Sequence, residues 1–377
     1  MRFLHTSDWQ LGLRRYYMDG DAQARYAGDR FEAVRRLGEV ARREGAACVV
    51  VAGDVFDSNR VDRRTVLRGL DAMASVALPV LLLPANHDPL DASSVYRSAA
   101  FREQRPANDH LLDGEAVVEV APGCEVVGAP WTSKRPLDDL VARRAAELAP
   151  APGRLRVLVA HGEVDALAPD PDDPAVIRLE AAERALAEGR FHYLALGDRH
   201  SATRVAERAW YSGTPEATDF DEERPGRVLR VDLDASGCRV EELEVGRWRF
   251  LPLAFHCAGE ADLERLRAEL DALDDRSRTV LRLTLEGQLP LHARVELDRL
   301  LADAGERFAA VDRAGGGLAL IPDDLDRDAL DLGGYARAAF EELLAEARGG
   351  GGRPEAEARV AADALALLYR LARGGAA

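Results

Sequence analysis

The sequence predicts an α/β protein in which buried strands alternate with amphipathic helices. Several short runs are apolar at almost every position, as expected of strands buried on both faces of a sheet. The segments between these runs repeat apolar residues at helical spacing. Each run is followed at once by polar or ionisable residues, which in layered α/β folds lie beyond the carboxyl ends of the strands, where ligands bind. The runs are residues 48–51, 78–84, 155–160 and 191–196.

Length and composition indicate an ordinary globular protein. The 377 residues suggest two or three domains, and 47% of them are hydrophobic. No apolar run approaches the ~20 residues of a membrane span, so we expect a cytoplasmic protein without membrane association. The net charge of −16, with Lys134 as the only lysine, argues against a protein that coats nucleic acid by bulk charge. The widely scattered cysteines predict free thiols rather than disulfides or a zinc site: Cys48, Cys124, Cys238 and Cys257.

The first ninety residues predict a βαβ unit that continues by the same alternation. A strand at 2–6 precedes Asp8, and helix 25–44 leads into the strand that ends before Asp54. Gly53 allows the chain to turn sharply there. We interpret Asp54 as a metal ligand, with a turn or helix-cap aspartate as the alternative. Helix 63–77 and strand 78–84 follow, and that strand ends at Asn86, His87 and Asp88.

The next segment repeats this pattern. An antiparallel pair over 115–127, a helix over 137–148 and strand 155–160 lead to His161, and residues 165–174 are expected to form a surface loop. Helix 179–188 precedes strand 191–196, which is followed by Asp198 and His200. Strands 210–213, 227–233 and 239–245 predict an antiparallel flank. Among the remaining histidines, His5 and His192 fall within strands and are interpreted as core residues, and a core position is also the alternative for His87.

Beyond residue 247 the pattern changes, because no strand ends in ionisable side chains. We predict a domain over 1–247, a small α+β domain over 248–330 and a helical tail over 331–377. The small domain should contain strand 248–257, helix 261–273, strand 279–286, helix 293–304 and strand 318–321. The tail holds two helical patterns separated by glycines 349–352. Their apolar faces must pack either on the chain itself or on a partner.

Metal-capable side chains follow five predicted strands. Two divalent ions about 3.5–4 Å apart need a shared carboxylate and a mixed set of nitrogen and oxygen ligands. The sequence supplies such a set: Asp8, Gln10, Asp54, Asn86, His87, His161, Asp198 and His200.

These residues form motifs that resemble the calcineurin-like metallophosphoesterases, and within them the DNA repair exonuclease branch that includes the nuclease subunit of the bacterial SbcCD complex. The motifs are Asp8-x-Gln10, Gly53-Asp54-x-x-Asp57, Asn86-His87-Asp88, His161-Gly162 and Gly197-Asp198-x-His200. The resemblance implies a four-layer β-sandwich flanked by helices, a capping domain, and a C-terminal helical segment that binds the coiled-coil base of an SMC-like ATPase.

The resemblance also implies roles for single residues. Asp8, Asp54 and His200 would hold one ion, and Asp54, Asn86 and His161 the other. His87 would be the general acid, oriented by Asp88. Gln10 and Asp198 stand where the family usually has histidines. Because oxygen ligands harden the site, they favour Mn²⁺ or Mg²⁺ over Zn²⁺.

The expected function is a Mn²⁺-dependent DNA exonuclease, with single-strand endonuclease activity, that works as a homodimer with the ATPase. The alternatives are another phosphoesterase, such as a nucleotide or protein phosphatase, and a non-catalytic scaffold with an impaired metal site. Candidate substrate contacts are residues suited to phosphates and bases, each with an ordinary surface or packing role as the alternative. They are Asn59, Arg60, Trp131, Lys134, Arg135, Tyr211 and Ser212.

Overall fold

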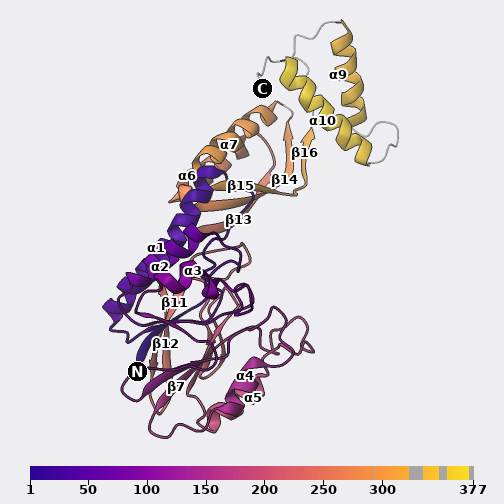
Figure 1. The fold of residues 1–377 in the computed structure, drawn as a ribbon. Helices are drawn as coiled ribbons and strands as arrows, with labels where there is room; N and C mark the ends of the chain where they lie inside the picture. The colour runs from indigo at the N-terminus through magenta and orange to yellow at the C-terminus, as the bar shows by residue number, and fades with distance from the viewer. Residues whose placement is uncertain (291, 322–333, 348–354, 373–377) are drawn as a thin grey trace. The chain divides into compact units, whose positions relative to one another are not determined.

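The computed structural model describes residues 1–290, 292–321, 334–347 and 355–372 (Figure 1). The chain divides into two compact units. The first unit consists of Met1–Tyr16 and Gln23–Trp248, and the second of Tyr17–Ala22 and Arg249–Ala377. The boundary predicted between the capping domain and the tail lies outside the described residues.

The first unit contains two six-stranded sheets. In one sheet the order is β12-β11-β1-β2-β3-β4. Strands β1 to β4 are parallel to one another, and β11 pairs antiparallel with both β1 and β12. Its strands are β1 (Arg2–Thr6), β2 (Val49–Val51), β3 (Val80–Leu82), β4 (Asp109–Leu111), β11 (Arg227–Leu233) and β12 (Cys238–Glu244).

The second sheet has the order β5-β6-β7-β8-β10-β9. Strands β6, β7, β8 and β10 are parallel, whereas β5 and β9 pair antiparallel with their neighbours. Its strands are β5 (Val117–Ala121), β6 (Cys124–Gly128), β7 (Leu155–His161), β8 (Tyr193–Gly197), β9 (Thr203–Ala206) and β10 (Ala209–Tyr211).

Alternating side chains join the two sheets and their helices into four layers. In β2, Val49 and Val51 pack in the core beneath the helices, and Val50 packs in the core between the sheets. One outer layer consists of α1 (Gly20–Glu44), α2 (Arg63–Ala74) and α3 (Ala99–Gln104), and the other of α4 (Leu140–Glu147) and α5 (Leu179–Ala187). The predicted α/β fold and its four layers are confirmed.

Several local expectations need correction. Strand β10 runs parallel to β8, and β11 and β12 join the other sheet, so the predicted antiparallel flank is divided between two sheets. His192 precedes β8 instead of lying within it, and its Nδ1 accepts a hydrogen bond from the backbone of Arg156. The short elements β4 and α3 were not predicted, because three and six residues are too few to show a periodicity.

The second unit carries the predicted strand-helix-strand-helix order. It contains β13 (Arg249–Cys257), α6 (Ala261–Ala272), β14 (Thr279–Pro290), α7 (Ala293–Arg307), β15 (Ala310–Ala314) and β16 (Leu318–Ile321). These four described strands run parallel, with β14 in the centre, and α6 and α7 are the crossover helices. The unit is therefore built from βαβ connections, a more regular arrangement than the expected α+β.

Two helices follow, α9 (Gly334–Ala347) and α10 (Glu355–Ala372), and they pack against each other. Phe340 and Leu365 are buried between them, whereas Val360, Leu367 and Leu371 on α10 are exposed. The predicted glycine run 349–352 lies outside the described residues. Within the described part of the chain, no helix is both long and apolar enough to cross a bilayer. All four cysteines are free thiols, as predicted.

Candidate metal centre

Two loops that leave neighbouring strands run side by side and carry the first ligands. The backbone N–H of Asp8 donates to the carbonyl of Gly53 (3.0 Å), and that of Gln10 donates to the carbonyl of Asp54 (2.8 Å). Asp8, Gln10 and Asp54 have positive φ angles of 54°, 41° and 52°, and Asp198 has 103°. Non-glycine residues with such backbone conformations are uncommon and cluster at functional sites.

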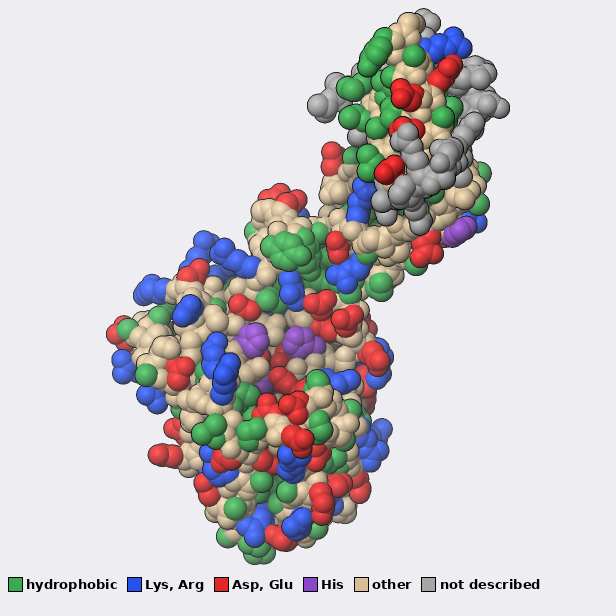
Figure 2. All heavy atoms as spheres, turned by 90° about the vertical axis from the view of Figure 1, so that its right-hand side faces the viewer, with side chains coloured by type: hydrophobic (Ala, Val, Ile, Leu, Met, Phe, Trp, Pro, Cys, Tyr) green, Lys and Arg blue, Asp and Glu red, His purple; other side chains and the backbone are tan. Residues whose placement is uncertain are grey.

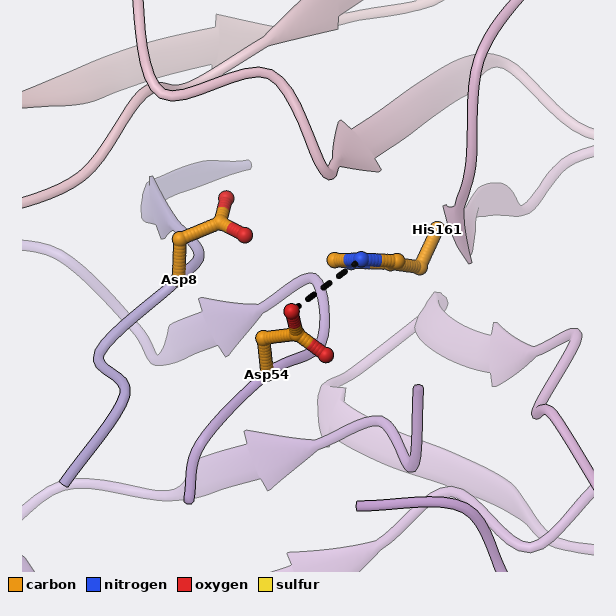
Figure 3. A group of neighbouring side chains, drawn as sticks. All are labelled: Asp8, Asp54 and His161. Carbon is orange, nitrogen blue, oxygen red and sulfur yellow. Dashed lines mark ion pairs between the residues drawn. The ribbon is translucent and has the colours of Figure 1, made fainter. Parts of the chain in front are cut away.

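Ligand atoms from both sheets meet at the carboxyl ends of the strands. One atom each of Asp8, Asp54 and His161 lies within 4.8 Å of the others, and all three residues are buried (Figure 3). Asp8 and Asp54 follow β1 and β2 of one sheet, whereas His161 ends β7 of the other. At the surface, histidine side chains gather beside acidic ones on one face of the molecule (Figure 2).

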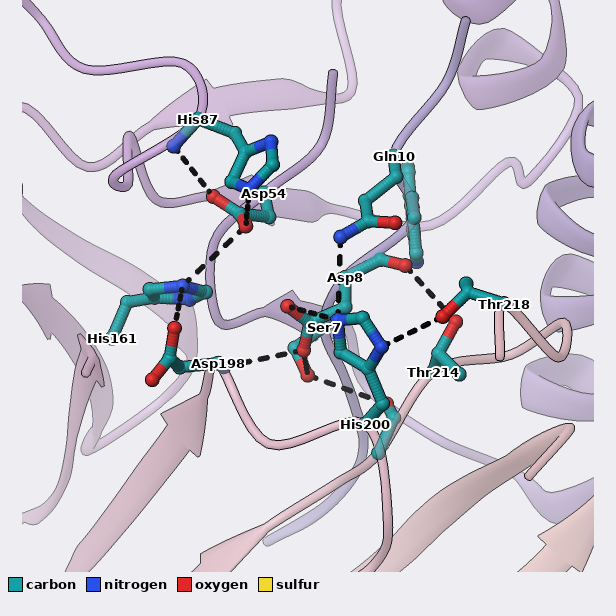
Figure 4. Close-up of polar contacts among 12 residues, drawn as sticks. Ser7, Asp8, Gln10, Asp54, His87, His161, Asp198, His200, Thr214 and Thr218 are labelled. Atoms are coloured by element: carbon teal, nitrogen blue, oxygen red, sulfur yellow. Dashed lines mark hydrogen bonds and ion pairs between the residues drawn. The ribbon is translucent and has the colours of Figure 1, made fainter. Parts of the chain in front are cut away.

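Asp8 uses one carboxylate oxygen to fix its orientation. Its Oδ2 accepts hydrogen bonds from the hydroxyl of Ser7 (2.5 Å) and the backbone N–H of Asp198 (3.2 Å) (Figure 4). Its Oδ1 is buried and finds no hydrogen-bond partner among the described residues. Because an unpaired buried oxygen is costly, Oδ1 is a strong candidate for a metal ligand.

His161 has the same division of roles. Its Nδ1 lies 2.8 Å from the carbonyl oxygen of Ala52, to which it donates. Its Nε2 has no hydrogen-bond partner in the described part of the chain, and lies 3.6 Å from Oδ2 of Asp54 and 3.4 Å from Oδ1 of Asp198. A histidine that donates one N–H to a carbonyl presents its other nitrogen to a metal. Oδ1 of Asn86 is also buried without a partner among these residues.

The carboxylates perturb one another and the histidines. Burial raises the pKa of Asp54 to about 7, and nearby Asp8 and Asp88 add to this while His161 opposes it. Burial alone would lower the pKa of His161, but Asp54, Asp198 and Asp8 raise it well above its usual range. Burial raises the pKa of Asp198, yet its contact with His161 lowers it overall. The cluster therefore concentrates negative charge that a divalent cation would neutralise.

Gln10 and His200 lie together on the Asp8 side of the cluster. The amide nitrogen of Gln10 is 3.2 Å from Nε2 of His200, and that Nε2 is 3.8 Å from Oδ1 of Asp8. Nδ1 of His200 lies 2.9 Å from Oε1 of Glu222 and 2.7 Å from the hydroxyl of Thr218. Gln10 thus presents its N–H₂ group to the imidazole, and its amide must rotate for the oxygen to serve as the expected ligand.

His87 lies beside the cluster, and the hydrogen bonds of Asp88 go to groups other than its imidazole. Nδ1 of His87 lies 2.8 Å from the carbonyl of Asp57, and its Nε2 is 3.9 Å from Oδ2 of Asp54. Asp88 instead accepts hydrogen bonds from two backbone N–H groups and a phenol: those of Phe56 (2.9 Å), Ala85 (3.0 Å) and Tyr96 (2.6 Å). The adjacent Asp88 side chain is fully buried and fastens the loop, because its acceptor capacity is used by these donors.

The candidate substrate contacts separate into two groups. Tyr211 and Ser212 are buried. The Tyr211 hydroxyl donates to the carbonyl of Gly162 and accepts the backbone N–H of Val164, and the Ser212 hydroxyl is hydrogen-bonded to that of Ser7. The amide of Asn59 is bound to the backbone of Pro89 and Val95. The polar groups of these three residues are thus engaged in bonds that hold the loops. Arg60, Lys134 and Arg135 are exposed, and Trp131 donates from Nε1 to the carbonyl of His161 (2.8 Å).

The donor set fits divalent metal ions. Among the predicted ligands, three buried atoms have no hydrogen-bond partner in the described part of the chain: Oδ1 of the Asp8 carboxylate, Oδ1 of the Asn86 amide and Nε2 of the His161 imidazole. A set dominated by oxygen with some imidazole suits hard or borderline ions such as Mg²⁺ and Mn²⁺.

Comparison with known proteins identifies the family. A family model of the calcineurin-like phosphoesterases matches residues 1–226. The chain belongs to the calcineurin-like phosphoesterase family. This confirms the family predicted from the motifs. Phosphoesterases of this family use dimetal centres, and the cluster around Asp8, Asp54 and His161 is the candidate for such a centre in this member.

A relative supports the DNA repair branch of the calcineurin-like phosphoesterases. The DNA double-strand break repair protein Mre11 of Aeropyrum pernix is 26% identical in an alignment of 267 residues that covers 65% of this chain. The match spans 61% of the length of that protein. Two solved structures are similar over 65% of this chain and 98% of their own: TT1561 of Thermus thermophilus (13% identity, TM-score 0.42) and a dimetal phosphatase from Danio rerio (16% identity, TM-score 0.40).

Some residues that shape this phosphoesterase site were not found by sequence reasoning. Glu222 and Thr218 contact His200 from a loop without periodicity, and Tyr96 reaches Asp88 from a short helical turn. Ser7 and Thr214 hold Asp8 through its carboxylate and its carbonyl, respectively. Ser7 had a sequence signal, since it directly precedes the aspartate at a strand end. The others lie too far from the motifs in sequence.

Proposed function

We propose that this calcineurin-like phosphoesterase is a metal-dependent DNA nuclease, an exonuclease with single-strand endonuclease activity. The observation that carries this proposal is the cluster of ligand atoms from both sheets that have no hydrogen-bond partner among the described residues, with His87 half-exposed beside it. The similarity to Mre11 directs the proposal toward DNA rather than toward a small phosphoester.

Two divalent ions, Mn²⁺ by preference, would be held by seven side chains: Asp8, Gln10, Asp54, Asn86, His161, Asp198 and His200. Bound there, the ions would supply the Lewis acidity that activates a nucleophile and neutralises charge on the phosphodiester. Asp54 lies between the two groups of ligands and is suited to be shared. Its Oδ1 accepts the backbone N–H of His87 (3.1 Å), which leaves Oδ2 directed at the cluster.

His87 is suited to deliver a proton to the leaving oxygen. Its Nδ1 is engaged with the carbonyl of Asp57, so Nε2 is the atom that faces the cluster. The side chain is 43% exposed, which leaves room for a substrate beside it. Positioned general acids of this kind contribute about 10²- to 10⁴-fold to rate.

Binding of DNA needs positive charge, which this chain of net charge −16 carries only locally. Arg60, Lys134 and Arg135 are exposed on the loops that follow β2 and β6, the strands that precede Asp54 and Trp131. Arginine and lysine position phosphates, and the indole of Trp131 offers a stacking surface. We propose that a homodimer and an SMC-like ATPase, bound through α9 and α10, supply the remaining affinity for DNA.

The test is hydrolysis of end-labelled duplex DNA with added Mn²⁺, with wild type compared with Asp54→Ala and His87→Ala. We expect degradation from the ends in the wild type, and its loss in both variants. Arg208→Ala, which changes an arginine at the opposite ends of the strands, is the control and should retain activity.

Two outcomes would favour the alternatives. Hydrolysis of p-nitrophenyl phosphate esters without cleavage of DNA would indicate a small-substrate phosphoesterase. Absence of both activities, together with no bound Mn²⁺ after dialysis, would indicate a scaffold with an impaired metal site.

A further inference from the structure

The surroundings of His200 determine which of its ring nitrogens carries the proton. Nδ1 has two neighbours, the carboxylate of Glu222 (2.9 Å) and the hydroxyl of Thr218 (2.7 Å). The Thr218 hydroxyl donates its own proton to Oε1 of Glu222. Both neighbours therefore present lone pairs to the imidazole, and Nδ1 must be the donor.

The opposite nitrogen of His200 then faces the proposed ions as an acceptor. In the neutral imidazole, a proton on Nδ1 leaves a lone pair on Nε2. That lone pair accepts from the amide nitrogen of Gln10 (3.2 Å) and lies 3.8 Å from Oδ1 of Asp8. The hydrogen bonds run in one direction, from Gln10 through His200 to Glu222.

Glu222 is built into the fold for this contact. Its side chain is only 5% exposed, and its Oε2 accepts the backbone N–H of Thr218 (2.8 Å). Arg15 donates to the carbonyl of Thr218 and so fixes the same turn. Burying a carboxylate costs free energy unless its oxygens accept hydrogen bonds. In Glu222, Oε1 accepts from His200 and Thr218, and Oε2 accepts from the backbone of Thr218.

We propose that Glu222 is a positioning residue that selects the Nδ1–H tautomer of His200. Glu222 would thereby increase the affinity for the metal ion held by Asp8 and His200. This inference rests on the proposed dimetal function. Without the carboxylate, the imidazole also adopts the tautomer with a proton on Nε2, which points a proton where the ion is bound. Carboxylates in such positions typically contribute about 10- to 100-fold to metal affinity.

The experiment uses the full chain carrying Glu222→Gln, because an amide can donate to Nδ1 as well as accept from it. The matched control is Glu223→Gln, which removes the same charge from the adjacent, exposed glutamate. Isothermal titration with Mn²⁺ should show one of the two binding steps weakened about tenfold or more in Glu222→Gln, and both steps unchanged in the control. Thr218→Val keeps the side-chain shape and should weaken the same Mn²⁺ binding step. It replaces Glu222→Gln in the titration if that variant does not fold.

A second readout needs no metal. The ¹⁵N chemical shifts of His200, measured above its imidazole pKa, should show the Nδ1–H tautomer in wild type and a mixture in Glu222→Gln. Unchanged Mn²⁺ binding together with an unchanged tautomer in Glu222→Gln would overturn the inference. If wild type binds no Mn²⁺, the proposed function fails, and the tautomer measurement still decides the role of Glu222.

Discussion

At the scale of single residues, the ligands of the metal centre share one design. Asp8, His161 and His200 each bond one polar atom to the surrounding protein and direct the other at the cluster. Side chains held in this way need little rearrangement when an ion binds. Gly53 contributes to this design, because its φ is +96° and an added Cβ would collide with the imidazole of His161.

The neighbours His87 and Asp88 should respond differently to substitution. Asp88→Asn replaces one of the two oxygens that accept from Phe56, Ala85 and Tyr96 with an N–H₂ group, so at least one of these donors loses its partner. We expect a loss of about 1–3 kcal/mol in the free energy of unfolding. His87→Gln should leave that free energy nearly unchanged and lower the rate of phosphodiester hydrolysis by about a hundredfold or more. Urea unfolding and single-turnover assays of both variants measure this. A stable, slow Asp88→Asn variant would instead make Asp88 an orienting residue.

The position of a residue along the sequence decided which parts of the site were predictable. Asp54 could be found because a run of buried β-branched residues ends just before it, and that pattern is local in sequence. Glu222 could not, since it lies 22 residues from His200 in a loop where carboxylates are common. The hydrogen bonds of Asp88 to Phe56, Ala85 and Tyr96 could not be predicted either, because adjacency to His87 in sequence does not determine where a side chain points.

At the scale of elements, short strand β4 carries a buried carboxylate far from the motifs. The side chain of Asp109 is fully buried beside Arg105, with 3.5 Å between its Oδ2 and Nε of the arginine. Burial raises the pKa of Asp109 to about 7, and the arginine only partly opposes this. The three residues of β4 gave no periodicity from which the strand could have been predicted.

This carboxylate should make stability depend on pH. Because the folded pKa exceeds the unfolded value of about 3.9, the folded state binds more protons, and its stability falls as pH rises from about 4 to about 7. Asp109→Asn should therefore gain on the order of 2–4 kcal/mol relative to wild type across that window. Urea unfolding at several pH values tests this, with exposed Asp71→Asn as control. Parallel curves for wild type and Asp109→Asn would refute it.

Helix α10 presents apolar residues that α9 does not cover. Val360, Leu367 and Leu371 are 69%, 49% and 65% exposed, whereas Leu365 is buried. The proposed ATPase contact predicts that the Leu367→Ser and Leu371→Ser double variant loses about tenfold or more in affinity for the coiled-coil partner without a change in melting temperature. Co-purification and thermal unfolding measure the two effects. Leu365→Ser should instead lower stability, and intact partner binding in the double variant would exclude this surface.

At the scale of the whole molecule, the predicted fold was correct because the alternation of buried strands and amphipathic helices extends over most of the first unit. The division of β10, β11 and β12 between two sheets was not readable, since pairing partners are set by contacts distant in sequence. The sequence predicted the two helices of the tail. It did not predict which of their apolar residues stay exposed, because apolar periodicity does not identify what packs on an apolar face.

Metal binding should stabilise the molecule, and more so at higher pH. A ligand at about 100 times its dissociation constant adds about 2.7 kcal/mol, which corresponds to a rise of roughly 5 °C or more in melting temperature. The carboxylates raise the pKa values of His161 and His200 against the effect of burial, so protons compete with the ions for these histidines at low pH. Mn²⁺ should therefore raise the melting temperature more at about pH 8 than at about pH 6, and chelation should reverse the rise. Equal shifts at both pH values would contradict this assignment of ligands.

The ligands are divided between the two sheets, with Asp8 and Asp54 on one and His161 on the other. Neither sheet alone assembles the cluster, so a partly folded chain in which only one sheet has formed lacks the means to cleave a phosphodiester. Catalytic competence would thus appear only once the sandwich has closed. For a protein proposed to cut DNA, this coupling would keep unfolded and partly folded copies from cutting it.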